Sequence, residues 1–297
     1  MGRILGAAFC SHVPRLMLPP RKRAVYMKGK VSTFYEALAD MYQARIASLK
    51  FDTFIVFDTH WWTTLEYVIN GHGRHRGVYT SDEIPWMINS YRYDYCGDST
   101  LADLIADECK KKKMPIYVSR DAYLPVHYPV LTTMRYLNLK APRRRVLPMS
   151  IAYTSSVANE LDYGDAIRKA VEKSDRNVVI VATGGLSHRF WDLDLIRQRA
   201  SADVKNIYSK ANREADLMII EKMKLGEHAE LLSKIGKLRQ KINAEGRFAH
   251  YLRMVGALGG LSCSIKGLQY GEYEAAAGTG QVNIWFDIPN NRKGRRE

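Results

Sequence analysis

The sequence predicts an α/β fold, a single domain in which helices flank a central mixed, mostly parallel sheet. Three short apolar runs, Ile4–Phe9, Thr53–Phe57 and Asn177–Ala182, have the composition of buried parallel strands. Segments with helical periodicity separate most of the predicted strands, as parallel crossover connections require. A largely polar helical stretch near residues 190–260 predicts a helical insertion in the C-terminal third.

The N-terminal half alternates predicted helices and strands. Apolar residues recur at the spacing of one helical face over residues 32–49, which predicts a helix there. Tyr67–Asn70 is predicted as a short strand, and Gly71–Tyr79, rich in His, Gly and Arg, as a loop. Tyr91–Tyr95 alternates Tyr with Arg and Asp, which is typical of an edge strand. The next predicted elements are a helix at Ser99–Cys109 and a strand at Ile116–Ser119.

The C-terminal half continues the alternation and adds the polar helices. Pro125 and Pro129 predict an ordered loop that leads into a helix at Val130–Leu137. The paired glycines Gly278 and Gly280 precede the last predicted strand. The remaining predictions are strands at Arg145–Ser150 and Gln281–Phe286 and helices at Glu160–Lys173, across much of Trp191–Glu221, at His228–Ile235 and at Ala249–Leu261.

The chain is strongly basic, with a net charge of +14 over 297 residues. Its positive clusters include Lys110–Lys113, Arg143–Arg145 and the tail. No aromatic residues interleave with them as a stacking platform for bases would require, so solvated faces are favoured over a nucleic-acid site. The domain is expected to span residues 1–290, followed by a disordered basic tail at 291–297.

The spacing of the cysteines and the hydropathy of the sequence indicate the environment in which the protein is expected to work. The four cysteines are widely spaced and form no CxxC pair, which argues against structural zinc and for a reduced, cytoplasmic chain. No stretch reaches the roughly 18 apolar residues expected of a membrane span. We therefore expect neither a membrane nor a nucleic-acid partner.

A histidine follows each of the three central predicted strands. His12, His60 and His188 come shortly after Ile4–Phe9, Thr53–Phe57 and Asn177–Ala182. In open α/β sheets ligands bind beyond the carboxyl ends of the strands, so these side chains are expected at one edge. Two histidines and a carboxylate would leave open positions on a metal, as in non-heme Fe(II) oxygenases. The alternative is that each histidine is an ordinary polar residue at a strand end, and spacing alone selects no carboxylate.

Six segments together resemble the class III extradiol ring-cleavage dioxygenases. That superfamily includes protocatechuate 4,5-dioxygenase, 2-aminophenol 1,6-dioxygenase and homoprotocatechuate 2,3-dioxygenases. The resemblance runs in order over nearly the whole chain, and Thr-His-Trp and Leu-Ser-His-Arg-Phe are its most specific parts. The segments are Ser-His-Val-Pro (11–14), Phe-Asp-Thr-His-Trp (57–61), Gly-Val-Tyr-Thr-Ser-Asp-Glu-Ile-Pro (77–85), Met-Arg-Tyr-Leu-Asn (134–138), Gly-Gly-Leu-Ser-His-Arg-Phe (184–190) and Gly-Thr-Gly-Gln-Val-Asn (278–283).

The resemblance implies an Fe(II) ion held by His12, His60 and a glutamate just ahead of a late helix. Glu245 matches that glutamate, although a Glu there would also suit the helix dipole without binding a metal. Glu221 and Glu227 are weaker candidates for the third ligand. The triad would also suit zinc, which leaves a zinc-dependent hydrolase as an alternative.

The resemblance also assigns residues for catalysis. His188 matches the acid/base histidine of the family, and Tyr128 matches an active-site tyrosine. His127, a further catalytic candidate, stands where the homoprotocatechuate branch carries Glu, so the exact substrate stays open. Tyr128 and His127 could instead anchor their proline-flanked loop. The other histidines are expected to be surface residues (His72 and His75) or structural (His228 and His250).

Together these features predict Fe(II)-dependent extradiol cleavage of a catecholic or 2-aminophenolic compound with O2. The positive charge suits a carboxylated substrate, and Arg15, Arg189 and Arg247 each adjoin a predicted site residue. The resemblance implies a homo-oligomer or an assembly with a second related subunit. A non-catalytic or partner subunit of the same fold is the main alternative, and a basic nucleic-acid-binding protein would leave the histidines unexplained.

Overall fold

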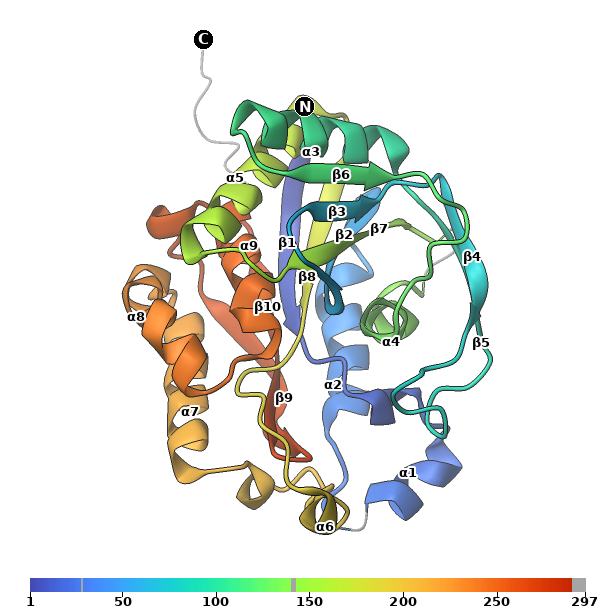
Figure 1. The fold of residues 1–297 in the computed structure, drawn as a ribbon, viewed down its shortest axis with the longest axis vertical. Helices are drawn as coiled ribbons and strands as arrows, with labels where there is room; N and C mark the ends of the chain where they lie inside the picture. The colour runs from blue at the N-terminus through green and yellow to red at the C-terminus, as the bar shows by residue number, and fades with distance from the viewer. Residues whose placement is uncertain (28, 140–142, 290–297) are drawn as a thin grey trace.

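The computed structural model describes residues 1–27, 29–139 and 143–289. Within them, eight strands form one sheet in the order β6-β3-β7-β2-β8-β1-β10-β9 (Figure 1). The strands are β1 (Arg3–Cys10), β2 (Thr53–Thr63), β3 (Tyr67–Asn70), β6 (Ile116–Ser119), β7 (Arg145–Ala152), β8 (Asn177–Thr183), β9 (Gly267–Ala276) and β10 (Thr279–Asp287). The predicted tail at 291–297 lies outside the described residues, so the boundary at residue 290 stays a prediction.

The centre of the sheet is parallel and its margins are not. β7, β2, β8 and β1 pair in parallel, whereas β10 pairs antiparallel with β1 and β9 antiparallel with β10. On the other side, β3 runs antiparallel to β7 and parallel to β6. The predicted mixed, mostly parallel sheet is confirmed, and the three strands that lead to histidines are direct neighbours.

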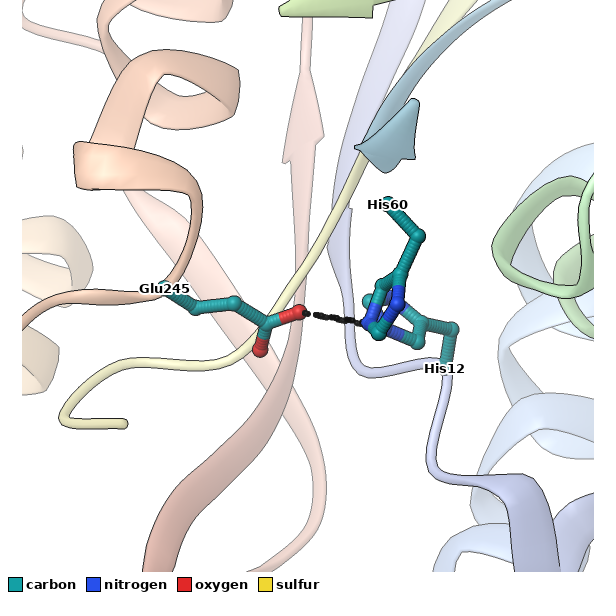
Figure 2. A group of neighbouring side chains, drawn as sticks. All are labelled: His12, His60 and Glu245. Atoms are coloured by element: carbon teal, nitrogen blue, oxygen red, sulfur yellow. Dashed lines mark ion pairs between the residues drawn. The ribbon is translucent and has the colours of Figure 1, made fainter. Parts of the chain in front are cut away.

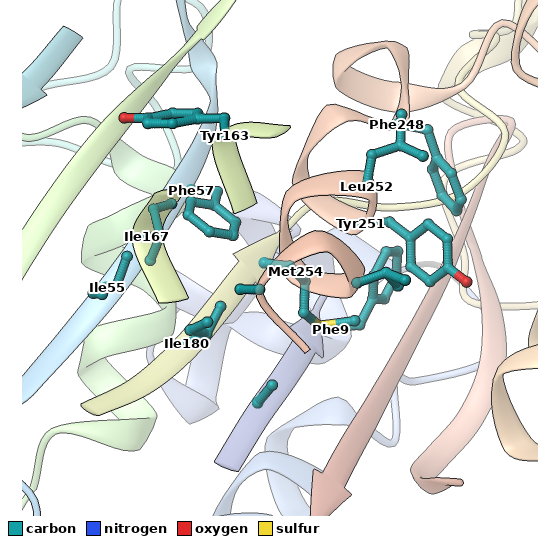
Figure 3. Packing of buried hydrophobic residues seen from close by; sticks show 14 of the residues in the cluster. Phe9, Ile55, Phe57, Tyr163, Ile167, Ile180, Phe248, Tyr251, Leu252 and Met254 are labelled. Atoms are coloured by element: carbon teal, nitrogen blue, oxygen red, sulfur yellow. The ribbon is translucent and has the colours of Figure 1, made fainter. Parts of the chain in front are cut away.

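Helices cover both faces of the sheet, which explains the continuous apolar runs of its central strands. On one face, Ile55, Phe57 and Ile180 pack against α5 (Val157–Lys173) and α9 (Ala249–Ala257), as Figure 3 shows. Alternate residues of the same strands face α2 (Phe34–Met41) and α4 (Tyr128–Leu137). The other helices are α1 (Pro20–Met27), α3 (Ser99–Lys111), α6 (Leu193–Ile196), α7 (Lys210–Leu225) and α8 (His228–Lys241).

The predicted helical insertion corresponds to α6 through α9, but α9 is a core helix of the domain. It packs against α5, β8 and β2 and is buried along its whole length. None of the described helices combines the length and apolarity needed to cross a bilayer.

Two sequence predictions about the margins of the fold were wrong, and one strand was missed. Gly71–Tyr79 is not a loop, because β4 (Arg74–Tyr79) pairs with β5 (Tyr91–Cys96) in a separate two-stranded sheet. The pleat of β4 turns His75 inward, where its Nε2 lies 3.1 Å from the Val146 carbonyl oxygen, so His75 is buried rather than exposed. The edge strand β9 was missed because its exposed, Gly- and Glu-containing sequence lacks the apolar run of a central strand.

Candidate metal centre

Three separate elements bring His12, His60 and Glu245 to the carboxyl edge of the central strands (Figure 2). His12 lies two residues beyond the end of β1, next to Ser11, whose amide donates to Asn283 Oδ1 over 3.0 Å. His60 lies late in β2, where pairing with β7 is interrupted between Phe57 and Trp62. That interruption frees the strand end from its sheet register.

The three side chains offer a donor set that fits a divalent transition metal. One ligand atom from each lies within 4.8 Å of the others. His12 Nε2 is 3.1 Å and His60 Nε2 is 3.8 Å from Glu245 Oε1. Neighbouring ligands around a metal with bonds of about 2.1 Å are separated by about 3.0–3.4 Å, so small side-chain shifts would close the site. Two imidazoles and a carboxylate are typical of non-heme iron and of zinc sites.

Glu245 is held in its ionised form although it is buried. Burial alone would raise the pKa of the carboxyl, but the His12 and His188 imidazoles and a hydrogen bond from His12 hold the pKa well below its usual range. The amide of Gly185 donates to Oε2 over 2.6 Å, and Thr59 Oγ1 donates to Oε1 over 3.0 Å. Glu245 is therefore oriented and charged as a metal ligand requires.

The residue after Glu245 must be glycine. Gly246 has a φ of +55°, and a Cβ added there would come within 2.7 Å of Thr59 Cγ2. The Glu-Gly pair that the sequence singled out thus follows from backbone conformation and from close approach to β2.

His60 is neutral, which is the form that binds metals. Burial, with a further contribution from His12, lowers the pKa of His60 to about 3. Its backbone amide donates to Asp58 Oδ1 over 2.9 Å. Its Nδ1 lies 3.6 Å from an oxygen of Glu83, a residue that sequence reasoning did not single out.

His188 lies near the second oxygen of the same carboxylate. Its Nε2 is 3.8 Å from Glu245 Oε2, and about a quarter of its side chain is exposed. The preceding Ser187 is tied to the buried Asp216, which accepts from the Ser187 amide over 2.9 Å and from its hydroxyl over 2.7 Å. Tyr273 donates a third hydrogen bond to Asp216 over 2.6 Å. Asp216 was missed because it lies on the polar helix α7, with no local signal of this contact.

Tyr128 contacts His60 directly, whereas His127 contacts Asp58, which in turn contacts His60. The Tyr128 hydroxyl is 2.9 Å from His60 Nε2, and burial raises its pKa well above the usual value, so it stays protonated. His127 Nδ1 is 3.7 Å from Asp58, the carboxylate that braces the backbone of His60.

Of the three predicted arginines, the structure brings Arg247 to a cavity of about 470 Å³ beside the site, which His60, His188 and Glu245 also line. Arg15 is buried elsewhere, with Nη2 donating over 3.0 Å to Glu274. Arg189 is exposed and stacks over Tyr208 at 4.1 Å. The weaker ligand candidates are also placed elsewhere, because Glu221 and Glu227 form surface ion pairs with Lys224 and Lys222.

An α/β sheet covered on both faces, with two histidines, a glutamate and a third histidine beside a cavity, has the features of a metal-dependent enzyme. Residues 6–287 match the family described as the catalytic LigB subunit of aromatic ring-opening dioxygenase. The chain belongs to this family, and its enzyme class is extradiol ring-cleaving dioxygenase. Dioxygenases of this family are metal-dependent.

Individual relatives agree with the family assignment. The chain is 31% identical to a 3,4-dihydroxyphenylacetate 2,3-dioxygenase from Escherichia coli over 262 residues, which cover 87% of this chain and 91% of that protein. It is 23% identical to a 2-aminophenol 1,6-dioxygenase beta subunit from a Pseudomonas species over 274 residues, covering 86% of each. The solved structure of an uncharacterized protein from Escherichia coli K12 has the same fold, with a TM-score of 0.60 at 12% identity, covering 95% of this chain and 99% of that one.

Proposed function

We propose that this chain uses Fe(II) to cleave a carboxylated catecholic or 2-aminophenolic ring with O2, beside the pair of ring donor groups. The observation that carries the proposal is the convergence of His12, His60 and Glu245 within 4.8 Å, with His188 Nε2 3.8 Å from the second oxygen of the same carboxylate. No other cluster of three metal-ligating side chains is found in the described parts of the chain.

His12, His60 and Glu245 would hold the ion and leave further positions for the substrate. Fe(II) supplies the one-electron chemistry that allows O2 to react with an aromatic ring. Glu245 supplies a negative ligand, because it is ionised, and His60 supplies a neutral one. The positive charge of the ion would favour the deprotonated form of a substrate hydroxyl, so that hydroxyl would lose its proton on binding.

His188 is placed to move that proton. It is half-buried, lines the cavity and is fixed by hydrogen bonds on both sides of its backbone, including Asn243 Nδ2 to the His188 carbonyl over 2.7 Å. An imidazole can accept a proton from a substrate hydroxyl and return it later as an acid. Tyr128, which keeps its proton, would donate a hydrogen bond to a substrate oxygen beside His60.

Two findings bear on the substrate and the assembly. The relative with 31% identity is named for an aromatic acid, and Arg247 offers this chain a cation in the cavity. The other relative is named as a beta subunit, which supports the proposal that this chain forms an oligomer, with itself or with a second related subunit. Because His12, His60 and Glu245 are all present, a catalytic chain is favoured over a non-catalytic partner subunit.

Anaerobic reconstitution with Fe(II) or Zn(II), followed by an oxygen-electrode screen of catechols, 2-aminophenols and their carboxylates, tests the proposal. We expect oxygen uptake with the iron-loaded protein and none with zinc. The variant His60→Ala should lose both bound iron and uptake. Uptake unchanged by His60→Ala would refute the proposed centre, and hydrolysis without oxygen uptake would favour the zinc enzyme.

A further inference from the structure

We propose that Arg239 and Arg247 together form an anion subsite in the cavity beside the metal centre. It holds the carboxylate of an aromatic acid whose ring lies along Trp62 and Tyr153. The inference rests on the proposed function and deepens it by naming the residues that bind the carboxylate and the ring of the substrate. Arg239 and the two aromatic residues carried no signal in the sequence.

Arg239 is a buried cation without a carboxylate of its own. It lies near the C-terminal end of α8, is 8% exposed, and lines the cavity. Its Nη1 donates to the Arg247 carbonyl over 3.2 Å, and no carboxylate of the described residues forms an ion pair with it. Glu160 contributes a favourable field, but its two oxygens are bound by Arg253.

A buried guanidinium in this setting is electrostatically costly. Burial, and then the nearby Arg247, lower the pKa of Arg239 from its usual value. Arginine does not lose its proton in proteins, so Arg239 remains a buried positive charge without an anionic partner among the residues that the structure describes. A negatively charged ligand that enters the cavity would offset this cost.

Arg247 reaches the same cavity through a strained segment. Its φ is +52° and that of Phe248 is +63°, a conformation that residues other than glycine rarely adopt. Its Nη1 donates to the Tyr153 carbonyl, and its guanidinium lies over the Tyr153 ring at 5.3 Å. In the part of the chain that the structure describes, Arg247 also lacks an ion-pair partner. Such strain persists where the surroundings enforce it, often at ligand sites.

The aromatic residues that line the cavity favour an aromatic acid over a simple anion. Trp62 and Tyr153 line it, are 42% and 60% exposed, and have ring centroids 5.5 Å apart at an interplanar angle of 60°. Exposed aromatic faces bind flat apolar groups well. His60 and Glu245 line the same cavity. A substrate can therefore place its donor pair at the metal ligands and its acid at the arginines, which bind carboxylates through paired N–H groups.

Binding measured without oxygen tests the subsite separately from turnover. Calorimetric titration of the anaerobic, iron-loaded protein would compare 3,4-dihydroxyphenylacetate with 4-methylcatechol, which has the same donor pair but no charge. We expect the acid to bind about 10- to 100-fold more tightly. Arg239→Gln and Arg247→Gln should each reduce the preference at least about tenfold, and Arg239→Lys should retain part of it. The exposed Arg197 provides a matched control, since Arg197→Gln should leave the preference unchanged.

The outcomes separate this inference from the proposed function. Equal binding of the two compounds by the wild-type protein would overturn the subsite, as would a full preference in Arg239→Gln. If Arg239→Gln does not unfold cooperatively, Arg247→Gln decides, because it leaves the buried guanidinium in place. An anaerobic preference without oxygen uptake, once air is admitted, would support the subsite and contradict the dioxygenase function.

Discussion

The contact between Asp216 and the turn that carries His188 leads to a prediction with two opposite effects. Asp216→Asn keeps the shape of the side chain but removes its charge. Burial raises the pKa of Asp216 to about 6, although hydrogen bonds from Tyr273 and Ser187 oppose the shift. We expect the variant to be relatively more stable at alkaline pH and yet slower in turnover.

The sign and size of the stability effect follow from linkage. The pKa of Asp216 is higher in the folded than in the unfolded chain. The stability that the protonated carboxyl gives the folded state is therefore fully present below about pH 3.8 and is lost as the pH rises through 6. Ionising this carboxyl costs about 1.6 kcal/mol of folding free energy at pH 5 and about 3 kcal/mol at pH 8. Between pH 5 and pH 8, the free energy of unfolding of the wild-type protein should therefore fall by about 1.4 kcal/mol relative to that of the Asn variant.

The catalytic effect has a separate cause. An amide offers one acceptor oxygen where the carboxylate offers two, so Ser187 and Tyr273 cannot both keep their present pairing. A displacement of about 1 Å at His188 can cost about 100-fold in rate, and we expect kcat to fall at least about tenfold. Bound metal should be unchanged, because Asp216 accepts its hydrogen bonds from Ser187 and Tyr273 and not from His12 or His60.

Urea unfolding at pH 5 and pH 8, with metal content and oxygen uptake measured in parallel, checks both effects. Asp175→Asn is the control, since Asp175 is 82% exposed and should change neither. A variant with wild-type pH dependence of stability and wild-type kcat would refute the reasoning.

Three further predictions follow from other parts of the structure. His188→Ala should leave bound metal unchanged but lower kcat by about 10²–10⁴-fold, measured by oxygen uptake, and loss of metal instead would make it a ligand. Burial lowers the pKa of His75 to about 4, so stability should fall as the pH drops from 6.5 toward 4, by about 1.3 kcal/mol between pH 7.5 and 5.5. His75→Gln should lack this loss in urea titrations, and an equal loss would contradict the assignment. Glu160→Gln leaves the buried Arg253 unpaired and should cost about 3–5 kcal/mol in urea unfolding, whereas Glu172→Gln in an exposed pair should cost less than about 1 kcal/mol.

The sequence by itself determined the centre of the fold. The apolar runs before His12, His60 and His188 became β1, β2 and β8, because strands buried on both faces need continuous apolar sequence. Parallel strands place their carboxyl ends at one edge, so the approach of these histidines was predictable from the three strands, whereas the order of the strands came from the structure. Glu245 came from family resemblance, since any loop of the fold could have supplied a carboxylate.

Only the tertiary structure decided what surrounds those residues. Asp216 and Arg239 lie on polar helices whose sequences predict solvated faces, and long-range packing turned them toward the site. His75 was expected at the surface, but the pairing of β4 with β5 buried it. Periodicity in a sequence reports which face of an element is apolar. It cannot report which distant polar group that element meets, because this depends on how the helices and strands are finally packed.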